Sequence, residues 1–362
     1  MKNQEKIFVI GHKNPDTDSI CSAIAYCDIK NRTTQESRYI PKRAGQINEE
    51  TEYVLNRFGV HPPGYLSNIG TQVKDMDIRL SPEANKSMSL KNAWDLMQEN
   101  SIVSLPIREK DGTLEGLITI GDIAKTYMDT TDSYLLSRAR TQYQRIAETI
   151  GGKVIEGNAH GYFIQGKIMV ATANPDKMKE YVEENDMVIM GNREEDHLQA
   201  IEQNVSCIIV GMGIEVTEKV LKLAHEKDIV IISSPYDTFT ISRLINQSIP
   251  VKYIMKTDNL VTFNTEDFTD DIQEVMIKHR HRAFPVINKK GKCIGTISRR
   301  NFLDMHRKKV VLVDHNEKDQ AVDNIDKADI MEIIDHHKLG TLQTMQPISF
   351  RNQPVGCTGT IM

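Results

Sequence analysis

The sequence lacks the features that mark secreted, membrane-spanning and nucleic-acid-binding proteins. Its five cysteines show no Cys-x-x-Cys spacing, which predicts free thiols in a reducing compartment, not a disulfide or zinc framework. The N-terminal region has only four consecutive apolar residues, "IFVI", too few for a signal peptide or membrane span. The net charge of −5 indicates no basic surface for nucleic acid. We therefore expect a cytoplasmic protein that binds neither membranes nor nucleic acid.

An internal repeat is present in the chain. The segment at 94–123 aligns with the segment at 273–302 without a gap, at a constant offset of 179 residues. Each copy predicts a helix, a proline-containing strand, a turn, a second strand and a second helix. "QVKDM" and "PVKYIM" open the two copies. Two copies are too few for a solenoid, and we expect them to pair as one compact unit.

The rest of the chain predicts parallel α/β structure. Between the copies, apolar runs such as "SCIIVGMG" and "IVIISS" alternate with helical patterns such as "VTEKVLKLAHEK". Outside the copies, three apolar strands end in Asp or His, in the segments 5–12, 308–317 and 330–337. Such strands are typical of a parallel sheet whose carboxyl edge carries a site. We predict one α/β domain that is interrupted by an insertion of roughly 70–308.

The three strand ends carry imidazoles and carboxylates and no thiolate. The side chains are those of His12, Asp16, Asp18, Asp314, His315, Asp335, His336 and His337. Nitrogen and oxygen ligands suit manganese, cobalt, magnesium or iron better than structural zinc. Taken together, the three segments predict a dinuclear metal site.

Each segment alone has a simpler interpretation. "NPDTDS" is most often a turn followed by a helix cap, with Asp18 or Ser19 as the cap of the next helix. "DHH" alone is a weak pattern. The order of the segments, each at the end of an apolar strand, favours the metal site.

"GHKNPDTDS", "VDHNE" and "DHHK" resemble the N-terminal domain of the DHH phosphoesterase superfamily, and within it the manganese-dependent inorganic pyrophosphatases of family II. The paired copies resemble cystathionine-β-synthase (CBS) domains, and the segment between them resembles a DRTGG domain. The resemblance implies a DHH-type parallel-sheet domain at 1–69 and 308–362, CBS domains at 70–130 and 250–307, and a DRTGG-like domain at 131–249.

The resemblance also implies a ligand set. His12, Asp16 and Asp314 would hold one metal. Asp18, Asp314 and His336 would hold the second, with Asp314 as the bridge. The metals would be two Mn²⁺ ions, or Co²⁺ or Mg²⁺, which would lower the pKa of a shared water and offset charge on the attacked phosphoryl group of pyrophosphate.

Three further side chains near the metals have implied roles. His337 would contact the substrate phosphate. Asp335 and His315 would orient the imidazole ligands through hydrogen bonds.

The chain departs from this family near its end. Family members continue with another metal-binding aspartate and a second domain whose Lys and Arg residues clamp pyrophosphate, whereas this sequence ends with "NQPVGCTGTIM". We therefore expect the chain to be incomplete and to have little activity by itself.

CBS pairs bind adenine nucleotides, so AMP, ADP or ATP are the expected regulators. The expected contacts are Thr119 and Asp122 in the first copy, and Ser298, Arg299 and Asn301 in the second. Thr119 and Asp122 are equally well explained as a helix cap. Asn301, where aspartate is commoner, would weaken ribose binding in the second copy. The resemblance further implies a homodimer formed through the CBS domains, with a spacer or dimer-forming role for the DRTGG-like segment.

Two other functions remain open. The chain is also consistent with a catalytically inactive nucleotide-binding protein, or with a DHH phosphoesterase that acts on polyphosphate or short oligonucleotides. "VDHNE" argues against the latter, because it resembles the pyrophosphatase version of that strand end.

Overall fold

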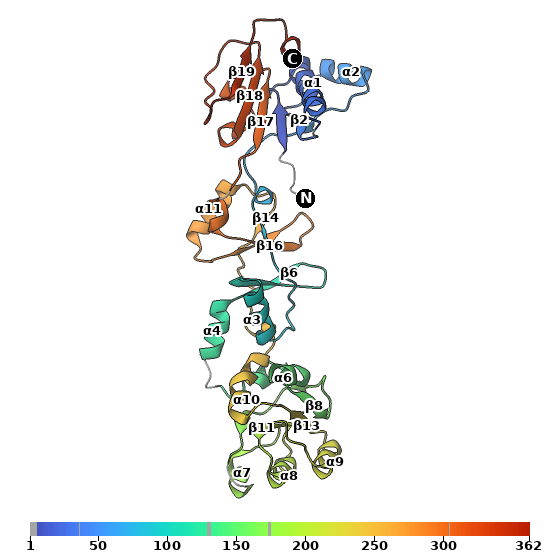
Figure 1. Cartoon of the computed structure of the whole chain (residues 1–362), viewed down its shortest axis with the longest axis vertical. Helices are drawn as coiled ribbons and strands as arrows, with labels where there is room; N and C mark the ends of the chain where they lie inside the picture. The colour runs from blue at the N-terminus through green and yellow to red at the C-terminus, as the bar shows by residue number, and fades with distance from the viewer. Residues whose placement is uncertain (1–5, 36, 129–131, 173–174, 304) are drawn as a thin grey trace. The chain divides into compact units, whose positions relative to one another are not determined.

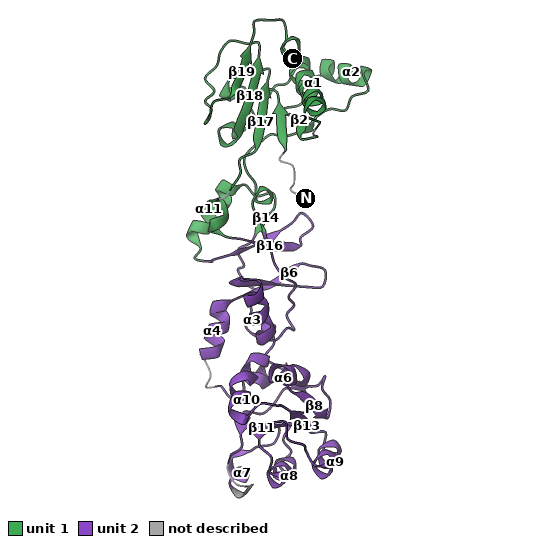
Figure 2. Ribbon diagram, viewed as in Figure 1, with its two compact units in different colours: residues 1–78, 263–280, 298–362 green, residues 79–262, 281–297 purple. Residues whose placement is uncertain are grey.

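The computed structural model describes residues 6–35, 37–128, 132–172, 175–303 and 305–362 (Figure 1). The chain forms two compact units, each assembled from separate segments (Figure 2). The first unit comprises residues 1–78, 263–280 and 298–362, and the second comprises residues 79–262 and 281–297. In the described part of the chain, no helix is long and apolar enough to cross a membrane.

A six-stranded, fully parallel sheet forms the centre of the first unit, in the order β19-β18-β17-β1-β2-β3. The strands are β1 (Ile7–Ile10), β2 (Tyr39–Arg43), β3 (Gly64–Tyr65), β17 (Lys309–Val313), β18 (Asp329–Asp335) and β19 (Ser349–Asn352). The three strands predicted to carry the site are therefore adjacent. Because they are parallel, their carboxyl ends meet at one edge of the sheet. The prediction of a mixed α/β fold with parallel sheets is confirmed.

Both faces of this sheet are buried, as parallel sheets require. Ile7 and Val9 of β1 pack on one face with Ala23 and Tyr26 of helix α1 (Thr17–Thr34). Ile10 faces the opposite side, in a cluster with the buried side chains of β17 and of the segment at 321–328. The other elements of the unit are α2 (Glu49–Arg57), η1 (Val73–Asp75), β14 (Phe263–Asn264), α11 (Thr269–Lys278), η4 (Arg299–Phe302), η5 (Lys318–Gln320), η6 (Ile325–Lys327) and η7 (Thr358–Thr360).

The second unit contains a five-stranded sheet in the order β10-β11-β12-β13-β8. Its first four strands are parallel, and β8 pairs antiparallel with β13 at the edge. The strands are β8 (Lys153–Glu156), β10 (Ile168–Val170), β11 (Met187–Met190), β12 (Cys207–Val210) and β13 (Val230–Ser233). The apolar runs between the repeat copies thus form the predicted parallel strands.

The helices of this region and its smaller strands complete the α/β arrangement. They are α5 (Leu135–Arg138), β7 (Thr141–Gln142), α6 (Tyr143–Thr149), β9 (Tyr162–Phe163), α7 (Pro175–Tyr181), α8 (Glu194–Glu202), α9 (Glu218–Glu226), α10 (Thr238–Leu244) and η2 (Ile245–Ser248).

The first repeat copy has the predicted order of elements. Helix α3 (Leu90–Glu99) leads into the antiparallel pair β5 (Ser104–Arg108) and β6 (Leu114–Thr119), and α4 (Ile120–Met128) follows. Its helices share one hydrophobic core with α6 and the five-stranded sheet. The expected boundary between residues 130 and 131 lies outside the described residues, and the other domain boundaries stay predictions.

The second copy differs from the prediction at its end. The antiparallel pair β15 (Phe284–Ile287) and β16 (Cys293–Ile297) is present, and β4 (Arg79–Leu80) pairs with β16. The segment after β16 forms only the short 3-10 turn η4, so the prediction of a second α-helix there is wrong for the described residues. The segments that open the two copies are alike, since each contains a 3-10 turn, η1 in the first and η3 (Val251–Tyr253) in the second.

Candidate metal centre

The loop after β1 is held tightly against the start of α1. A Cβ atom at Gly11 would lie 1.9 Å from Ser19 Oγ, so only glycine fits there. Ser19 Oγ accepts a hydrogen bond of 3.1 Å from the backbone N–H of His12. Asp16 is the N-cap of α1, and its Oδ1 accepts a 2.9 Å hydrogen bond from Ser19 N. The prediction of Asp18 or Ser19 as the cap is therefore wrong by two or three positions.

Asp314 lies directly after β17 in a strained backbone conformation. Its φ of +64° is in the left-handed region, which costs a non-glycine residue roughly 1–3 kcal/mol. The carboxylate is almost completely buried, which raises its pKa. Oδ1 accepts a 2.9 Å hydrogen bond from Thr358 Oγ1, whereas the buried Oδ2 accepts none from the described residues.

The first candidate group combines Asp314 with two side chains of the β1 loop. His12 Nε2 lies 3.3 Å from Asp314 Oδ2 and 3.8 Å from Asp16 Oδ1. One ligand atom from each of the three side chains lies within 4.8 Å of the others. Burial opposes a charged imidazole, but the hydrogen bond and charge of Asp314, together with the charges of Asp16 and Asp335, raise the pKa of His12. The group therefore concentrates negative charge around one imidazole, a setting that suits a cation.

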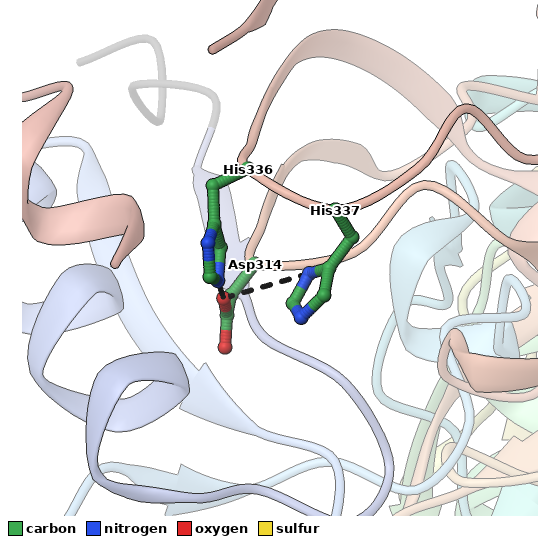
Figure 3. A group of neighbouring side chains, drawn as sticks. All are labelled: Asp314, His336 and His337. Atoms are coloured by element: carbon green, nitrogen blue, oxygen red, sulfur yellow. Dashed lines mark ion pairs between the residues drawn. The ribbon is translucent and has the colours of Figure 1, made fainter. Parts of the chain in front are cut away.

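The second candidate group combines Asp314 with two imidazoles that follow β18 (Figure 3). Asp314 Oδ1 lies 3.3 Å from His336 Nε2 and 3.9 Å from His337 Nδ1. The other nitrogen of His336, Nδ1, lies 2.9 Å from the carbonyl oxygen of Val355. A carbonyl oxygen can only accept a hydrogen bond, so we assign the proton of neutral His336 to Nδ1. The Nε2 lone pair then faces a carboxylate oxygen, an arrangement that needs a cation or a proton between them.

Asp18 lies beside the second group. Its Oδ2 is 3.7 Å from His336 Nε2. The carboxylate accepts hydrogen bonds from Ser22 Oγ (2.9 Å), Thr358 N (2.6 Å) and Gly359 N (3.2 Å). Burial opposes ionisation, but these hydrogen bonds together lower the pKa of Asp18. A carboxylate offers about four lone-pair positions, so the three hydrogen bonds leave Asp18 able to act as a ligand.

Asp335 fixes the orientation of His337. The fully buried Oδ1 of Asp335 accepts a 2.8 Å hydrogen bond from His337 Nδ1, and it also accepts the backbone N–H groups of His336 and His337. Asn316 Nδ2 donates to the other oxygen of Asp335. His337 is half exposed, and its Nε2 remains for another ligand. Asp335 therefore orients the side chain of His337, which is expected to contact phosphate. It does not orient the imidazole of His336, a predicted metal ligand, as the sequence had suggested.

His315 does not have the orienting role expected from the sequence. Its ring is buried, and Nδ1 donates a 2.9 Å hydrogen bond to the Val313 carbonyl oxygen. Its Nε2 has no hydrogen-bond partner among the described residues. Burial lowers the pKa of His315 to about 4, which keeps the ring neutral. The ring packs edge-on against His12 at a centroid distance of 6.4 Å, so its contact with a predicted ligand is steric.

The donor set fits divalent transition metals. It consists of carboxylate oxygens and imidazole nitrogens, with one buried carboxylate oxygen and one imidazole lone pair unsatisfied. The predicted metal ligands His12, Asp16, Asp18, Asp314 and His336 all lie at this edge of the sheet. Their role as ligands stays a prediction.

Two side chains that contact the candidate metal groups were not predicted from the sequence. Thr358 contacts both Asp18 and Asp314, and Asn316 contacts Asp335. Asn316 lies within "VDHNE", so that motif held a signal for it. Thr358 lies in the quoted terminal segment, where no pattern distinguished it.

In the first repeat copy, the expected nucleotide contacts form a cap. Thr119 Oγ1 and N both donate to Asp122 Oδ2, at 2.6 and 2.9 Å. Lys256 Nζ lies 3.3 Å from Asp122 Oδ1. Thr119 and Asp122 thus form a helix cap, which was one of the two roles expected of them. A contact with a nucleotide would be a second role of the same side chains.

The corresponding residues of the second copy form a similar cap. Ser298 N and Oγ donate to Asn301 Oδ1 at 2.7 and 2.9 Å. Arg299 donates to the carbonyl oxygens of Met276 and His279, which fixes its guanidinium group within the first unit. The nucleotide roles of all five residues stay predictions.

Comparison with known proteins identifies the inserted domains. The CBS domain model matches residues 78–129 and 251–308, and the DRTGG domain model matches residues 145–248. A crystal structure of the CBS and DRTGG domains of the regulatory region of Clostridium perfringens pyrophosphatase, complexed with the activator diadenosine tetraphosphate, is 34% identical. It covers 63% of this chain and 100% of that chain, with a TM-score of 0.60. The predicted CBS pair and DRTGG domain are confirmed.

Two relatives match along the whole chain. The cobalt-dependent inorganic pyrophosphatase of C. perfringens is 39% identical over 360 residues, which are 99% of this chain and 65% of the relative. The probable manganese-dependent inorganic pyrophosphatase of Thermotoga maritima is 33% identical over 362 residues, 100% of this chain and 66% of the relative. The chain thus spans about 65% of the length of these relatives, and along its own full length it matches the family II inorganic pyrophosphatases that contain CBS and DRTGG domains.

Proposed function

We propose that the carboxyl edge of the six-stranded sheet is the metal centre of an enzyme that hydrolyses inorganic pyrophosphate to two phosphates. The supporting observation is the position of Asp314, whose two carboxylate oxygens face the two candidate groups separately. Oδ2 lies near His12, and Oδ1 lies near His336. This is the arrangement expected of a carboxylate that bridges two metals. The relatives' names, which specify cobalt or manganese, support the same metals here.

The chain's own residues have separate roles in this proposal. His12, Asp16 and Asp314 hold one cation, and Asp18, Asp314 and His336 hold the other. Two bound cations would supply an activated water and offset the negative charge of pyrophosphate.

His337 binds a phosphate oxygen of the substrate. Its Nδ1 proton is held by Asp335, so that Nε2 points to the ligand in a fixed orientation. The half-exposed position of His337 is consistent with this contact.

Phosphate release from pyrophosphate tests the activity. The protein is stripped with a chelator, reloaded with Mn²⁺, Co²⁺ or Mg²⁺, and assayed with metal content measured by elemental analysis. We expect two metals per chain, and more activity with Mn²⁺ or Co²⁺ than with Mg²⁺, because imidazole ligands favour transition metals. Asp314→Ala should lose both metals and at least ~10³-fold in rate. Asp319→Asn, an exposed carboxylate on η5, is the matched control. Equal activity after chelation or with Mg²⁺ alone would contradict the proposal.

We further propose that adenine nucleotides regulate this activity through the CBS domains. Thr119, Asp122, Ser298, Arg299 and Asn301 are the proposed contacts, and the related regulatory region binds diadenosine tetraphosphate. Titration calorimetry with AMP, ADP and ATP should show binding and a raised melting temperature. A lack of heat with all three nucleotides and an unmoved melting curve would leave only a dimerisation role.

Two variants test which repeat copy holds the ribose. Asp122→Ala should weaken nucleotide binding more than Asn301→Ala, because a carboxylate accepts ribose hydroxyls more strongly than an amide. Glu184→Ala, an exposed carboxylate outside both repeat copies, is the control. The regulated enzyme should both release phosphate and bind nucleotide, whereas the inactive sensor would bind nucleotide without releasing phosphate.

We propose that the protein is a cytoplasmic homodimer formed through its CBS domains. The support is an apolar hollow of about 310 Å³ lined by Leu90 and Trp94 of α3 and by Ile123 and Tyr127 of α4. Trp94 is 39% exposed and Tyr127 is 42% exposed, which leaves aromatic surface to be covered. All five cysteines are free, as expected in a reducing compartment.

Light scattering across a concentration series tests this oligomeric state. Trp94→Lys should shift the protein toward monomer, whereas Tyr134→Lys, at another exposed aromatic residue, should not. A monomeric wild-type protein would contradict the proposal.

A further inference from the structure

A small cationic hollow in the second unit has no role in the functions proposed above. Its volume is about 40 Å³, several times the space that one water needs by the same measure. Arg140, Arg145 and Lys252 line it, together with Gln142 and Tyr162. It has no Asp or Glu in its lining.

The three cations of this hollow are unpaired within the described part of the chain. None of Arg140, Arg145 and Lys252 forms an ion pair or side-chain hydrogen bond with a described residue. Some other cations of the same unit have carboxylate partners. Lys86 contacts Glu109 and Glu115 at 2.8 and 2.6 Å, for example. The three cations that line this hollow thus lie near one another without a carboxylate partner among the described residues.

The nearest acidic residue on the same helix does not neutralise them. Glu148 of α6 lies one turn after Arg145, where an ion pair could form. Its Oε1 instead accepts a 2.9 Å hydrogen bond from Gln144 Nε2. The positive charge of Arg145 is thus left directed to the hollow's lining, with no carboxylate beside it in that lining.

Backbone pairing holds the two walls of the hollow. One wall is formed by β7 and β9, where Gln142 pairs with Tyr162. The other wall is formed by Ser87 of the first repeat copy and by Pro250 and Lys252 at the start of the second copy. There Lys252 N donates to the Lys86 carbonyl oxygen at 3.0 Å, and Ser89 pairs with Pro250. The cations are therefore presented from ordered backbone on both sides.

Arg140 occupies a position that normally favours another residue type. It follows the C-cap of α5 with a φ of +51°, in the left-handed region where glycine or asparagine is usual. Arg140 therefore presents its guanidinium group to the hollow from a backbone conformation that is unfavourable for arginine. Residues held in such conformations cluster at ligand and active sites, where the surrounding structure holds the strained backbone in place.

From these observations we propose that the hollow is a binding site for a multiply charged, phosphate-type oxyanion. Guanidinium groups match phosphate oxygens with paired hydrogen bonds, and Lys252 supplies a third positive charge. Three unpaired cations favour a dianion or trianion over a single carboxylate. Gln142 and Tyr162 add an amide and a phenol that can hydrogen-bond the remaining oxygens. Arg145 and Tyr162 lie within the DRTGG match, Lys252 lies within the second CBS match, and Arg140 and Gln142 lie just before the DRTGG match begins.

Calorimetric titration of the whole chain with inorganic phosphate tests the site. Chelator is present throughout, so that no bound metal attracts phosphate, and the ionic strength is held constant with KCl. Pyrophosphate and acetate are titrated in parallel. We expect phosphate and pyrophosphate to bind and acetate to bind more weakly than either. Acetate binding as tight as phosphate binding would overturn the choice of a multiply charged oxyanion.

Charge-neutralising variants locate the binding. Arg145→Gln combined with Lys252→Gln should weaken phosphate binding by at least ~10-fold, the effect of losing charge-assisted hydrogen bonds. Lys222→Gln, at an exposed lysine of α9, makes the same kind of charge change away from the hollow and should leave binding unchanged. Equal phosphate affinity in the double variant and the wild type, or no binding to the wild type, would overturn the proposal.

Arg140→Gly gives a second readout that does not depend on the double variant. Glycine adopts the left-handed conformation without strain, so the variant should melt at a higher temperature than the wild type. It should nevertheless bind phosphate more weakly, because it loses one guanidinium group. A higher melting temperature with undiminished phosphate binding would show that Arg140 is not a ligand residue and would overturn its assignment.

Discussion

Asp314→Asn should stabilise the metal-free protein while it abolishes metal binding. In the wild-type protein, the buried Oδ2 of Asp314 accepts no hydrogen bond from a described residue, although His12 Nε2 lies 3.3 Å away. An asparagine can keep its oxygen toward Thr358 and place its Nδ2 donor near His12. The amide would then donate to the lone pair of neutral His12 and satisfy a position that is unsatisfied in the wild type.

The expected gain follows from three contributions. A net hydrogen bond contributes about 0.5–1.5 kcal/mol, and asparagine tolerates a φ near +64° better than most residues. Removal of a buried charge adds to the gain, because burial disfavours the ionised carboxylate. We expect about 1 kcal/mol in the absence of metal, or roughly 2–4 °C in melting temperature for a domain of 150–250 residues.

The gain should depend on pH with a definite sign. The contact with Asp314 raises the pKa of His12, so the attraction between the charged imidazole and the carboxylate stabilises the wild type at low pH. That contribution is complete below the unfolded-state pKa of about 6.5 and is lost as the pH rises through the higher folded-state value. The advantage of Asp314→Asn should therefore grow from pH 6 to pH 8.5.

Differential scanning calorimetry in chelator, repeated with Mn²⁺, measures both effects. The wild type should gain melting temperature with metal, since ligands that bind only the folded state stabilise it. The variant should show no such gain and no bound metal by elemental analysis. A variant that is less stable than the wild type in chelator at pH 8.5, or that keeps two metals, would refute the assignment of Asp314.

Three other variants test separate parts of the centre. Gly11→Ala should lower the urea midpoint by an amount equivalent to ~1–3 kcal/mol, because its Cβ would lie 1.9 Å from Ser19 Oγ. Thr358→Val removes a donor to Asp314, the carboxylate proposed to bridge the two metals, but keeps its backbone N–H, so a chelator competition assay should show roughly 10–100-fold weaker metal binding. Asp335→Asn should leave the metal content unchanged and lower kcat/KM for pyrophosphate by about tenfold, because His337 loses its charged orienting partner. Unchanged values in these assays would contradict the corresponding contacts.

The position of the centre was predictable because it depends on local patterns. Apolar runs that end in Asp or His predict buried parallel strands, and β1, β17 and β18 are adjacent in the sheet. Parallel strands bring their carboxyl ends together wherever they lie in the sequence. The ligand set could therefore be assembled from segments some 300 residues apart without a structure.

Details that depend on three-dimensional contact were not predictable. The cap of α1 is Asp16 and not Asp18, because the backbone N–H of His12 donates to Ser19 Oγ and closes the loop against the start of the helix. Thr358 reaches Asp314 through a 3-10 turn far along the chain, and no local pattern indicates that contact. The end of the second repeat copy was also not predictable from local pattern. The capping box at Ser298 is present there, but a short 3-10 turn follows it in the described residues and not an α-helix.

The simple interpretation of "NPDTDS" and the metal interpretation are not alternatives. Asp16 caps α1 through Oδ1, and the same carboxylate belongs to the first candidate metal group. A carboxylate has two oxygens and about four lone-pair positions, so one side chain can serve both roles. The cap of α1 therefore holds a candidate ligand, Asp16, in place without any metal. A helix-capping hydrogen bond of a carboxylate is therefore compatible with metal binding by the same carboxylate. Only a measurement of bound metal can separate the two roles of Asp16.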